Sequence, residues 1–214
     1  MPLKIESFED EFIDKICKES VVDLNKFYEI NWVHHLPVPI VVKDRKSIDL
    51  LKGEKTELWV VGWAEGNKVF ILNHNSFESE SDHKYSPERY YSLLKHEISH
   101  TFYRVLSDGH VKPIWLCEGV AIYTSGQNGE KRPVSHFKGF LDFYENGGKG
   151  VYDESGFAVH LLVREYGKQK LLDLIKGLKS IVSQKDFTAL FVKTYGIKPI
   201  YDSFNKLLEK YPLK

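Results

Sequence analysis

The stretch His96-Glu97-Ile98-Ser99-His100 lies inside a segment with helical periodicity. Histidines four positions apart share one face of an α-helix, so both imidazoles can converge on one metal ion. Glu97 stands beside His96, where its carboxylate can reach a water molecule on that ion. The stretch therefore predicts a hydrolytic metal site with two histidine ligands and a general base.

The flanking residues predict the helix that carries this stretch. Ser86 before Pro87 is typical of a helix start, because serine accepts a hydrogen bond from a free backbone N–H and proline tolerates the first helical position. Ser107-Asp108-Gly109 is a typical stop. Apolar residues recur at the spacing of one buried face: Leu94, Ile98, Phe102 and Val105. A buried helix with two incidental histidines is the alternative.

A third ligand is suggested further along the chain. Residues 115–123 read Trp-Leu-Cys-Glu-Gly-Val-Ala-Ile-Tyr, with Glu118 as the single carboxylate of an apolar segment. A buried carboxylate without a partner is unfavourable, so we expect Glu118 to bind the metal rather than to cap a helix. Cys117 would point about 100° away from Glu118 on a helix, which favours a small buried thiol. Trp115 is expected to anchor this helix, and Tyr123 to pack in the core.

Three motifs in order resemble those of the gluzincin metallopeptidases, in which two histidines and a glutamate hold zinc. The separation between His100 and Glu118 is close to the spacing of that family. Residues 151–158 read Val-Tyr-Asp-Glu-Ser-Gly-Phe-Ala and are similar to the tyrosine-x-x-x-glycine-x-alanine segment of its aminopeptidase-like branch. The resemblance extends more loosely over residues 55–212, including a Phe187 to Ile197 segment like the end of compact domains of this clan.

The resemblance implies a zincin-like fold and one Zn²⁺ ion held by His96, His100 and Glu118. Glu97 would act as the general base. The neutral phenol of Tyr152 would donate a hydrogen bond to the oxyanion.

A peptide substrate also needs a place to bind in extended form. The strand Val69, Phe70, Ile71, Leu72 and Asn73 precedes the metal helix and is expected to be a free sheet edge along the cleft. The inner half of a hairpin is an equal alternative for this strand.

One segment departs from the resemblance. The aminopeptidases have a glycine-x-methionine-glutamate-asparagine segment, whose glutamate holds the free amine of the substrate. Residues 62–67 here read Gly-Trp-Ala-Glu-Gly-Asn, so only Gly62 and Glu65 match by position. We interpret this segment as a hairpin turn and do not expect strict aminopeptidase activity.

The remaining patterns predict an α+β fold in one domain, residues 1–214. A helical and β-rich lobe (1–85) would precede a helical lobe (86–214), with the metal site between them. Residues 7–31 have the apolar spacing of a helix, and Pro37-Val38-Pro39 breaks the chain before a strand at 40–43. A short helix at 44–51 ends at Gly53, and residues 58–63 and 68–73 form a hairpin. Helices are expected from Pro87 onward, with breaks near these residues: Gly109, Gly126–Pro133, Gly147–Gly150, Gly167 and Gly196.

Composition excludes several classes of protein. Lysine plus arginine and aspartate plus glutamate each total 30, so no net charge favours nucleic acid or an anionic membrane. No apolar run has the length of a membrane span, the first ten residues do not resemble a secretory signal, and two cysteines do not make a disulfide framework. We therefore expect a cytoplasmic protein unless a leader has been removed.

The sequence as a whole favours a zinc metallopeptidase whose partner is a peptide or protein substrate. A zinc hydrolase of another amide or acyl bond, or a zinc-binding scaffold, is the alternative. The sequence does not identify the side chains that orient the two imidazole rings. The other histidines are expected at the surface or in satisfied core positions: His34, His35, His74, His83, His110, His136 and His160.

Overall fold

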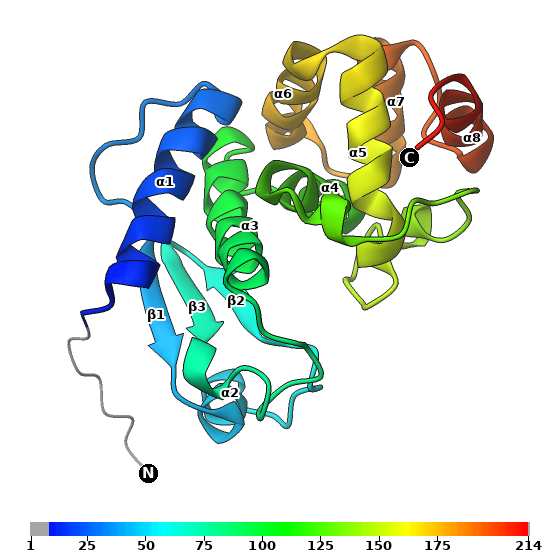
Figure 1. The fold of residues 1–214 in the computed structure, drawn as a ribbon. Helices are drawn as coiled ribbons and strands as arrows, with labels where there is room; N and C mark the ends of the chain where they lie inside the picture. Colours follow the sequence, from blue (N-terminus) through cyan, green and yellow to red (C-terminus); the bar gives the residue numbers. More distant parts are fainter. Residues whose placement is uncertain (1–8, 214) are drawn as a thin grey trace.

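The computed structural model describes residues 9–213, which form eight α-helices and a three-stranded sheet (Figure 1). The predicted α+β class is confirmed. The elements in chain order are α1 (Glu11–Tyr28), β1 (Val38–Val42), α2 (Arg45–Lys52), β2 (Gly62–Glu65), β3 (Lys68–Leu72), α3 (Pro87–Leu106), α4 (Ile114–Ser125), α5 (Val151–Tyr166), α6 (Lys168–Gly177), α7 (Gln184–Tyr195) and α8 (Tyr201–Lys210). The interpretation of residues 1–8, including the secretory signal and the helical place of Phe8, lies outside the described residues.

The sheet has the order β1-β3-β2, with β3 in the centre. β1 pairs with β3 in parallel, with Ile40 opposite Phe70, and β2 pairs with β3 antiparallel, with Trp63 opposite Phe70. The expectation that residues 69–73 form a free edge is therefore wrong. Both edges of β3 are already hydrogen-bonded, because β2 pairs with one edge and the chain, after α2 and β2, brings β3 back beside β1.

The hairpin between β2 and β3 is confirmed, with a tighter turn than expected. Gly66 adopts a positive φ of 59° in the turn, and Glu65 is an exposed strand residue. Residues 58–61 were expected to be strand but precede β2 as a loop. The Arg45 guanidinium accounts for this, because it donates to the carbonyl oxygens of Glu57, Leu58 and Val60 and so occupies groups that a strand partner would use.

Helix α1 begins at Glu11 and ends at Tyr28, inside the predicted range 7–31. The Asp10 carboxylate accepts hydrogen bonds from the backbone N–H groups of Phe12 and Ile13 and so starts the helix. A left-handed Glu29 ends it. Pro39, expected as a chain break, lies within β1. An edge strand tolerates this proline because one side of its backbone needs no hydrogen-bond donor.

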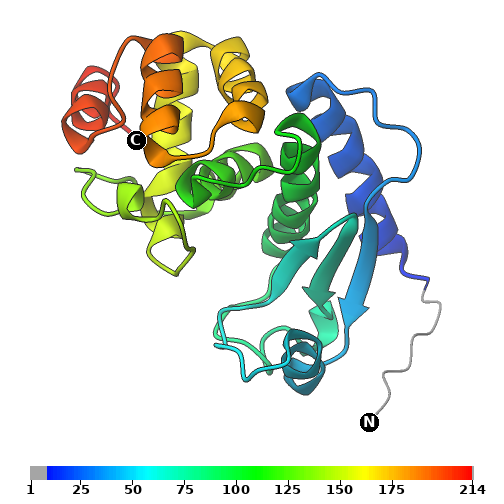
Figure 2. The ribbon, with the colours of Figure 1, turned by 180° about the vertical axis from the view of Figure 1, so that it is seen from behind.

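Helix α3 packs on β2 and β3 and on α1, and its other side packs on α4 (Figures 1 and 2). The start at Ser86 is confirmed, since its hydroxyl accepts a hydrogen bond from the Arg89 N–H. Leu94, Ile98 and Phe102 are buried as predicted, but Val105 is 51% exposed because its face is uncovered at the last turn. The expected lobe boundary at residue 85 does not separate α3 from the sheet, since α3 contacts both lobes.

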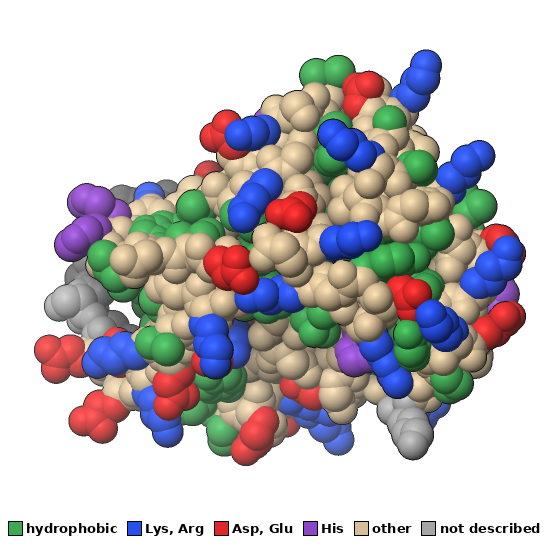
Figure 3. Space-filling view, turned by 90° about the horizontal axis from the view of Figure 1, so that it is seen from above, with side chains coloured by type: hydrophobic (Ala, Val, Ile, Leu, Met, Phe, Trp, Pro, Cys, Tyr) green, Lys and Arg blue, Asp and Glu red, His purple; other side chains and the backbone are tan. Residues whose placement is uncertain are grey.

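The helical lobe packs around Trp115, which is buried and contacts Phe140, Phe187 and Phe204 edge to face. Its predicted role as the anchor of α4 is confirmed. One hydrophobic cluster runs through both lobes, from Ile13 in α1 to Leu208 in α8. None of the helices within residues 9–213 is long and apolar enough to cross a bilayer. Basic and acidic side chains are interspersed over the face shown in Figure 3.

Helices α4 and α5 approach closely at two glycines, Gly119 and Gly156. A Cβ atom at Gly119 would lie 2.6 Å from the Ser155 carbonyl oxygen. A Cβ atom at Gly156 would lie 2.3 Å from Ile122 Cγ2 and 2.4 Å from Asn128 Oδ1. The contact sets the position of α4, and therefore of Glu118, relative to the rest of the lobe.

We expect Gly156→Ala to lower the free energy of unfolding by about 1–3 kcal/mol, the usual range for overpacking. Gly129→Ala is the matched control, because a Cβ there would meet no atom of residues 9–213 within 4 Å. Urea unfolding of the two variants and the wild type measures the difference. Equal stability of the two variants would contradict the close helix contact.

Candidate metal centre

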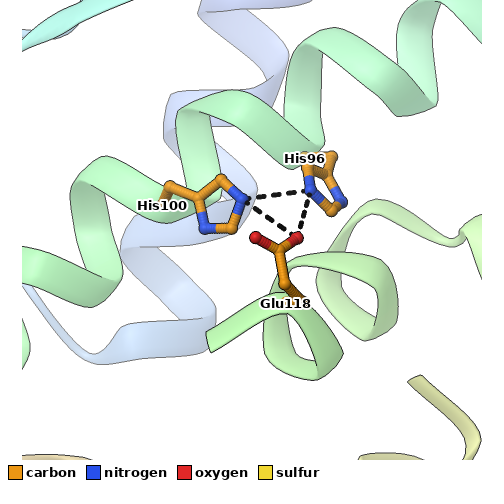
Figure 4. Close-up of side chains that lie close together, drawn as sticks. All are labelled: His96, His100 and Glu118. Atoms are coloured by element: carbon orange, nitrogen blue, oxygen red, sulfur yellow. Dashed lines mark hydrogen bonds and ion pairs between the residues drawn. The ribbon is translucent and has the colours of Figure 1, made fainter. Parts of the chain in front are cut away.

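Three side chains converge where helices α3 and α4 pack together (Figure 4). His96 and His100 extend from α3, and their Nε2 atoms are 3.1 Å apart. Glu118 extends from α4, and its Oε2 atom lies 3.2 Å from His96 Nε2 and 3.5 Å from His100 Nε2. The structure therefore brings together all three side chains that the sequence suggested as ligands.

The arrangement of these atoms fits a divalent cation. A tetrahedral zinc ion with ligands at its usual bond lengths places the ligand atoms roughly 3.3–3.5 Å apart, close to the spacings observed here. Glu118 Oε2 is buried and has no hydrogen-bond partner within the part of the chain that the structure describes. A bound cation would satisfy this oxygen together with the two facing nitrogens. The donor set of two imidazoles and one carboxylate suits zinc and related transition metals.

A buried network of hydroxyl groups joins the helices that carry the ligands. Ser99 Oγ lies 2.8 Å from the Tyr28 hydroxyl of α1 and 2.8 Å from Thr124 Oγ1 of α4. Ser99 is fully buried between His96 and His100 on α3. The sequence did not lead us to expect that Ser99 would join the helices. Its position as a polar residue on a buried helix is the sequence feature that could have indicated this role. The network therefore links α3 to both α1 and α4 beside the two histidine ligands.

Cys117 is a buried thiol, as predicted, and it also contacts a ligand. Its Sγ atom lies 3.3 Å from Nδ1 of His100, on the side of the ring away from Glu118. A contact at Nδ1 orients the imidazole so that Nε2 is directed toward the metal position. His96 Nδ1 is buried and has no hydrogen-bond partner among the described residues.

His100 and Glu118 stabilise opposite charges: each favours the charged form of the other. Burial disfavours the charged form of His100, but the facing Glu118 carboxylate and Cys117 outweigh it and raise the His100 pKa well above its usual value. Burial likewise disfavours the Glu118 carboxylate, yet the two imidazoles hold its pKa well below the usual range. In the metal-free site these two shifts favour a protonated His100 that faces an ionised Glu118.

We expect metal binding at pH 7 to release protons, because a histidine ligand must lose its proton and the His100 pKa is raised. Calorimetric titration with zinc in buffers of different ionisation enthalpy measures this release. The observed heat should vary with the buffer, and the affinity should rise with pH up to the raised His100 pKa. A heat that is independent of the buffer would contradict the prediction.

Glu97 is buried at the wall of a cavity of about 300 Å³ that also exposes His96. Burial raises the Glu97 pKa, although His96 and His100 oppose this shift. Gly62 lies directly above the carboxyl group, since a Cβ there would be 3.1 Å from Glu97 Oε1. A larger residue at position 62 would crowd the predicted base.

Tyr152 lies in the first turn of α5 and reaches the same cavity. Its ring centroid is 6.2 Å from that of His96 and 6.0 Å from that of Trp59. Burial, together with the nearby Glu118 and Glu97, raises the pKa of its phenol well above 10.0. The phenol is therefore neutral and available as a hydrogen-bond donor.

The residues predicted to bind substrate do not line this cavity. Its wall on the sheet side consists instead of the segment Trp59–Gly62, and its mouth includes His83, Lys84 and Arg89. His160 lies further along α5 and contacts Tyr123, which is half-buried at the edge of the core. His74 is satisfied by Asp10 at 3.0 Å.

Searches with protein-family models, curated proteins and solved structures gave no match to this chain.

Proposed function

We propose that this protein is a zinc metallopeptidase of the gluzincin type with a zincin-like fold. The observation that carries the proposal is the convergence of His96, His100 and Glu118, next to a cavity that is lined by His96 and the Glu97 carboxylate. A zinc ion held by the three ligands would supply a Lewis acid that polarises the scissile carbonyl and acidifies water. The order of the three motifs in residues 96–158 supports the same proposal.

Glu97 is suited to move the proton in this reaction. It would accept a proton from the attacking water and deliver it to the leaving amine. Its raised pKa favours holding the proton between these two steps. Tyr152 would donate its phenolic hydrogen to the carbonyl oxygen as negative charge develops there.

The proposed binding strand for the peptide substrate is β2, at its outer edge, in place of β3. Val61 faces β3, because its carbonyl oxygen accepts a hydrogen bond from the Leu72 N–H. In an antiparallel ladder the facing alternates, so the peptide groups of Gly62 point away from β3, on the cavity side. The next outward carbonyl, that of Ala64, is already taken by Arg104 at 3.0 Å. An extended substrate would therefore pair with β2 at Gly62, next to the general base.

Removal and restoration of metal test the proposal. The protein is stripped with a chelator, reloaded with zinc, analysed for metal content and assayed with a mixed peptide library. We expect one zinc per chain, and peptide cleavage only in the loaded protein. Binding of zinc without cleavage of any peptide would redirect the assignment to another amide or acyl bond or to a scaffold. Failure to bind zinc would refute it.

A further inference from the structure

Lys131 contributes an amino group to the wall of the same cavity. Its Nζ atom donates a hydrogen bond to the backbone carbonyl oxygen of Tyr152. It also lies 5.9 Å from the centroid of the Tyr152 ring. Because the Tyr152 ring is itself near His96, Lys131 places a positive charge beside the metal centre.

This ammonium group lacks an acidic partner within residues 9–213. The acidic side chains that raise its pKa are Asp153, Glu130 and Glu118, and none of them forms an ion pair with Lys131. Glu130 is engaged by Ser92 Oγ at 2.6 Å and by Arg89 at 3.6 Å. Glu118 faces the two histidines, and Asp153 is exposed.

Burial without a carboxylate is unfavourable for an ammonium group. Burial lowers the Lys131 pKa, although the surrounding acidic groups oppose the shift. A carboxylate supplied by a ligand would relieve this cost and accept a charge-assisted hydrogen bond. Lys131 has donors left for such a bond, because an ammonium carries three and the Tyr152 carbonyl uses one.

The rest of the cavity also favours an anion. Arg89 is paired with Glu130, and Lys84 is exposed at the mouth, so Lys131 is the partly buried cation among the described residues that line this cavity. A bound divalent cation would be offset by the two carboxylates beside it, Glu118 and Glu97. The charge of Lys131 would then remain uncompensated in the cavity of the loaded protein.

We propose that Lys131 binds a carboxylate of the substrate, so that the site prefers peptides with an acidic group beside the scissile bond. This inference rests on the proposed peptidase function. Two sources supply the same chemistry: an aspartate or glutamate side chain, or the free carboxyl terminus of the peptide.

Matched peptide pairs test the preference. One pair differs only in aspartate against asparagine near the cleaved bond, and the other in a free carboxyl terminus against an amide. We expect wild-type kcat/KM to favour the carboxylate member of one pair by about tenfold or more, a factor of the size that one charge-assisted bond provides. The pair that responds identifies the source of the carboxylate.

Variants at position 131 assign the preference to this side chain. Lys131→Met should reduce the ratio within the pair to near one, mainly through KM, and Lys131→Arg should retain a preference. Lys84→Met, at an exposed lysine of the cavity mouth, should keep the wild-type ratio. The ratio is the decisive quantity because a shift of Tyr152 would slow both members of a pair equally.

A wild-type ratio near one, or an unchanged ratio in Lys131→Met, would overturn the inference while leaving the peptidase function intact. A zinc-loaded protein that cuts no peptide would contradict the peptidase function. In that case the same pairs are titrated calorimetrically into the zinc-loaded wild type and Lys131→Met. Tighter binding of the carboxylate member to the wild type alone would support Lys131 as an anion site, and any other result would overturn it.

Discussion

Replacing Glu97 by glutamine is expected to lower kcat for peptide cleavage by about 10²- to 10⁴-fold, the usual contribution of a positioned general base. The amide has nearly the shape of the carboxyl group, so it fits the space under Gly62, but it cannot accept the proton. Zinc content should remain that of the wild type, because His96, His100 and Glu118 are unchanged. Metal analysis and peptide kinetics on the same preparation measure both quantities.

The stability of the metal-free protein shows whether Glu97→Gln still folds. Burial raises the Glu97 pKa above its value of 4.5 in an unfolded chain, so the ionised carboxylate opposes folding at neutral pH. The metal-free Glu97→Gln protein should therefore be at least as resistant to urea as the metal-free wild type. Activity close to the wild-type level in a zinc-loaded Glu97→Gln protein would show that another group moves the proton.

Replacing Glu118 by glutamine is expected to weaken zinc binding by more than about 100-fold. Loss of a group that only orients a ligand costs about 10- to 100-fold in metal affinity, and Glu118 is proposed to bind the metal directly. Glu130→Gln is the matched control, because Glu130 borders the same cavity but is engaged by Ser92 and Arg89. Competition with a chelating dye measures both affinities. Equal affinity of the two variants would refute the three-ligand site.

The metal-free Glu118→Gln protein should also lose stability in a defined pH window. The lowered Glu118 pKa stabilises the fold above pH 4.5 and this stability is lost as the pH falls through the lowered pKa. The raised His100 pKa stabilises the fold below pH 6.5 and this stability is lost as the pH rises through the raised pKa. The difference in the free energy of unfolding between the wild type and Glu118→Gln should therefore be largest between pH 4.5 and pH 6.5. Urea unfolding in the presence of chelator, from pH 3 to 9, measures it.

Features that depend on a few neighbouring residues could be predicted from the sequence. Ser86 and Pro87 start α3, and Gly53 at φ 74° ends α2. Gly66 forms the turn of the hairpin. These are local hydrogen bonds and backbone preferences, which require no distant partner. The placement of His96 and His100 on one face of a helix belongs to the same class.

The pairing of the strands and the contacts between side chains of different helices at the site could not be predicted. The parallel pairing of β1 with β3 removes the expected free edge, and local periodicity contains no information about it. The contact between Cys117 and His100 depends on how α4 lies against α3, as does the hydroxyl network at Ser99. Each of these contacts joins residues from different elements.

The sequence by itself determined which side chains are chemically able to form the site: two histidines one helical turn apart, a carboxylate beside them, and a second carboxylate in an apolar segment. Only the tertiary structure decided that Glu118 meets both imidazoles and that β2 rather than β3 borders the cavity. It also decided that Lys131 lies beside Tyr152 without an acidic partner among residues 9–213. The physical reason is that helical periodicity is a property of consecutive residues. The distance between side chains on different helices is set by packing, here by the close approach of α4 and α5 at Gly119 and Gly156.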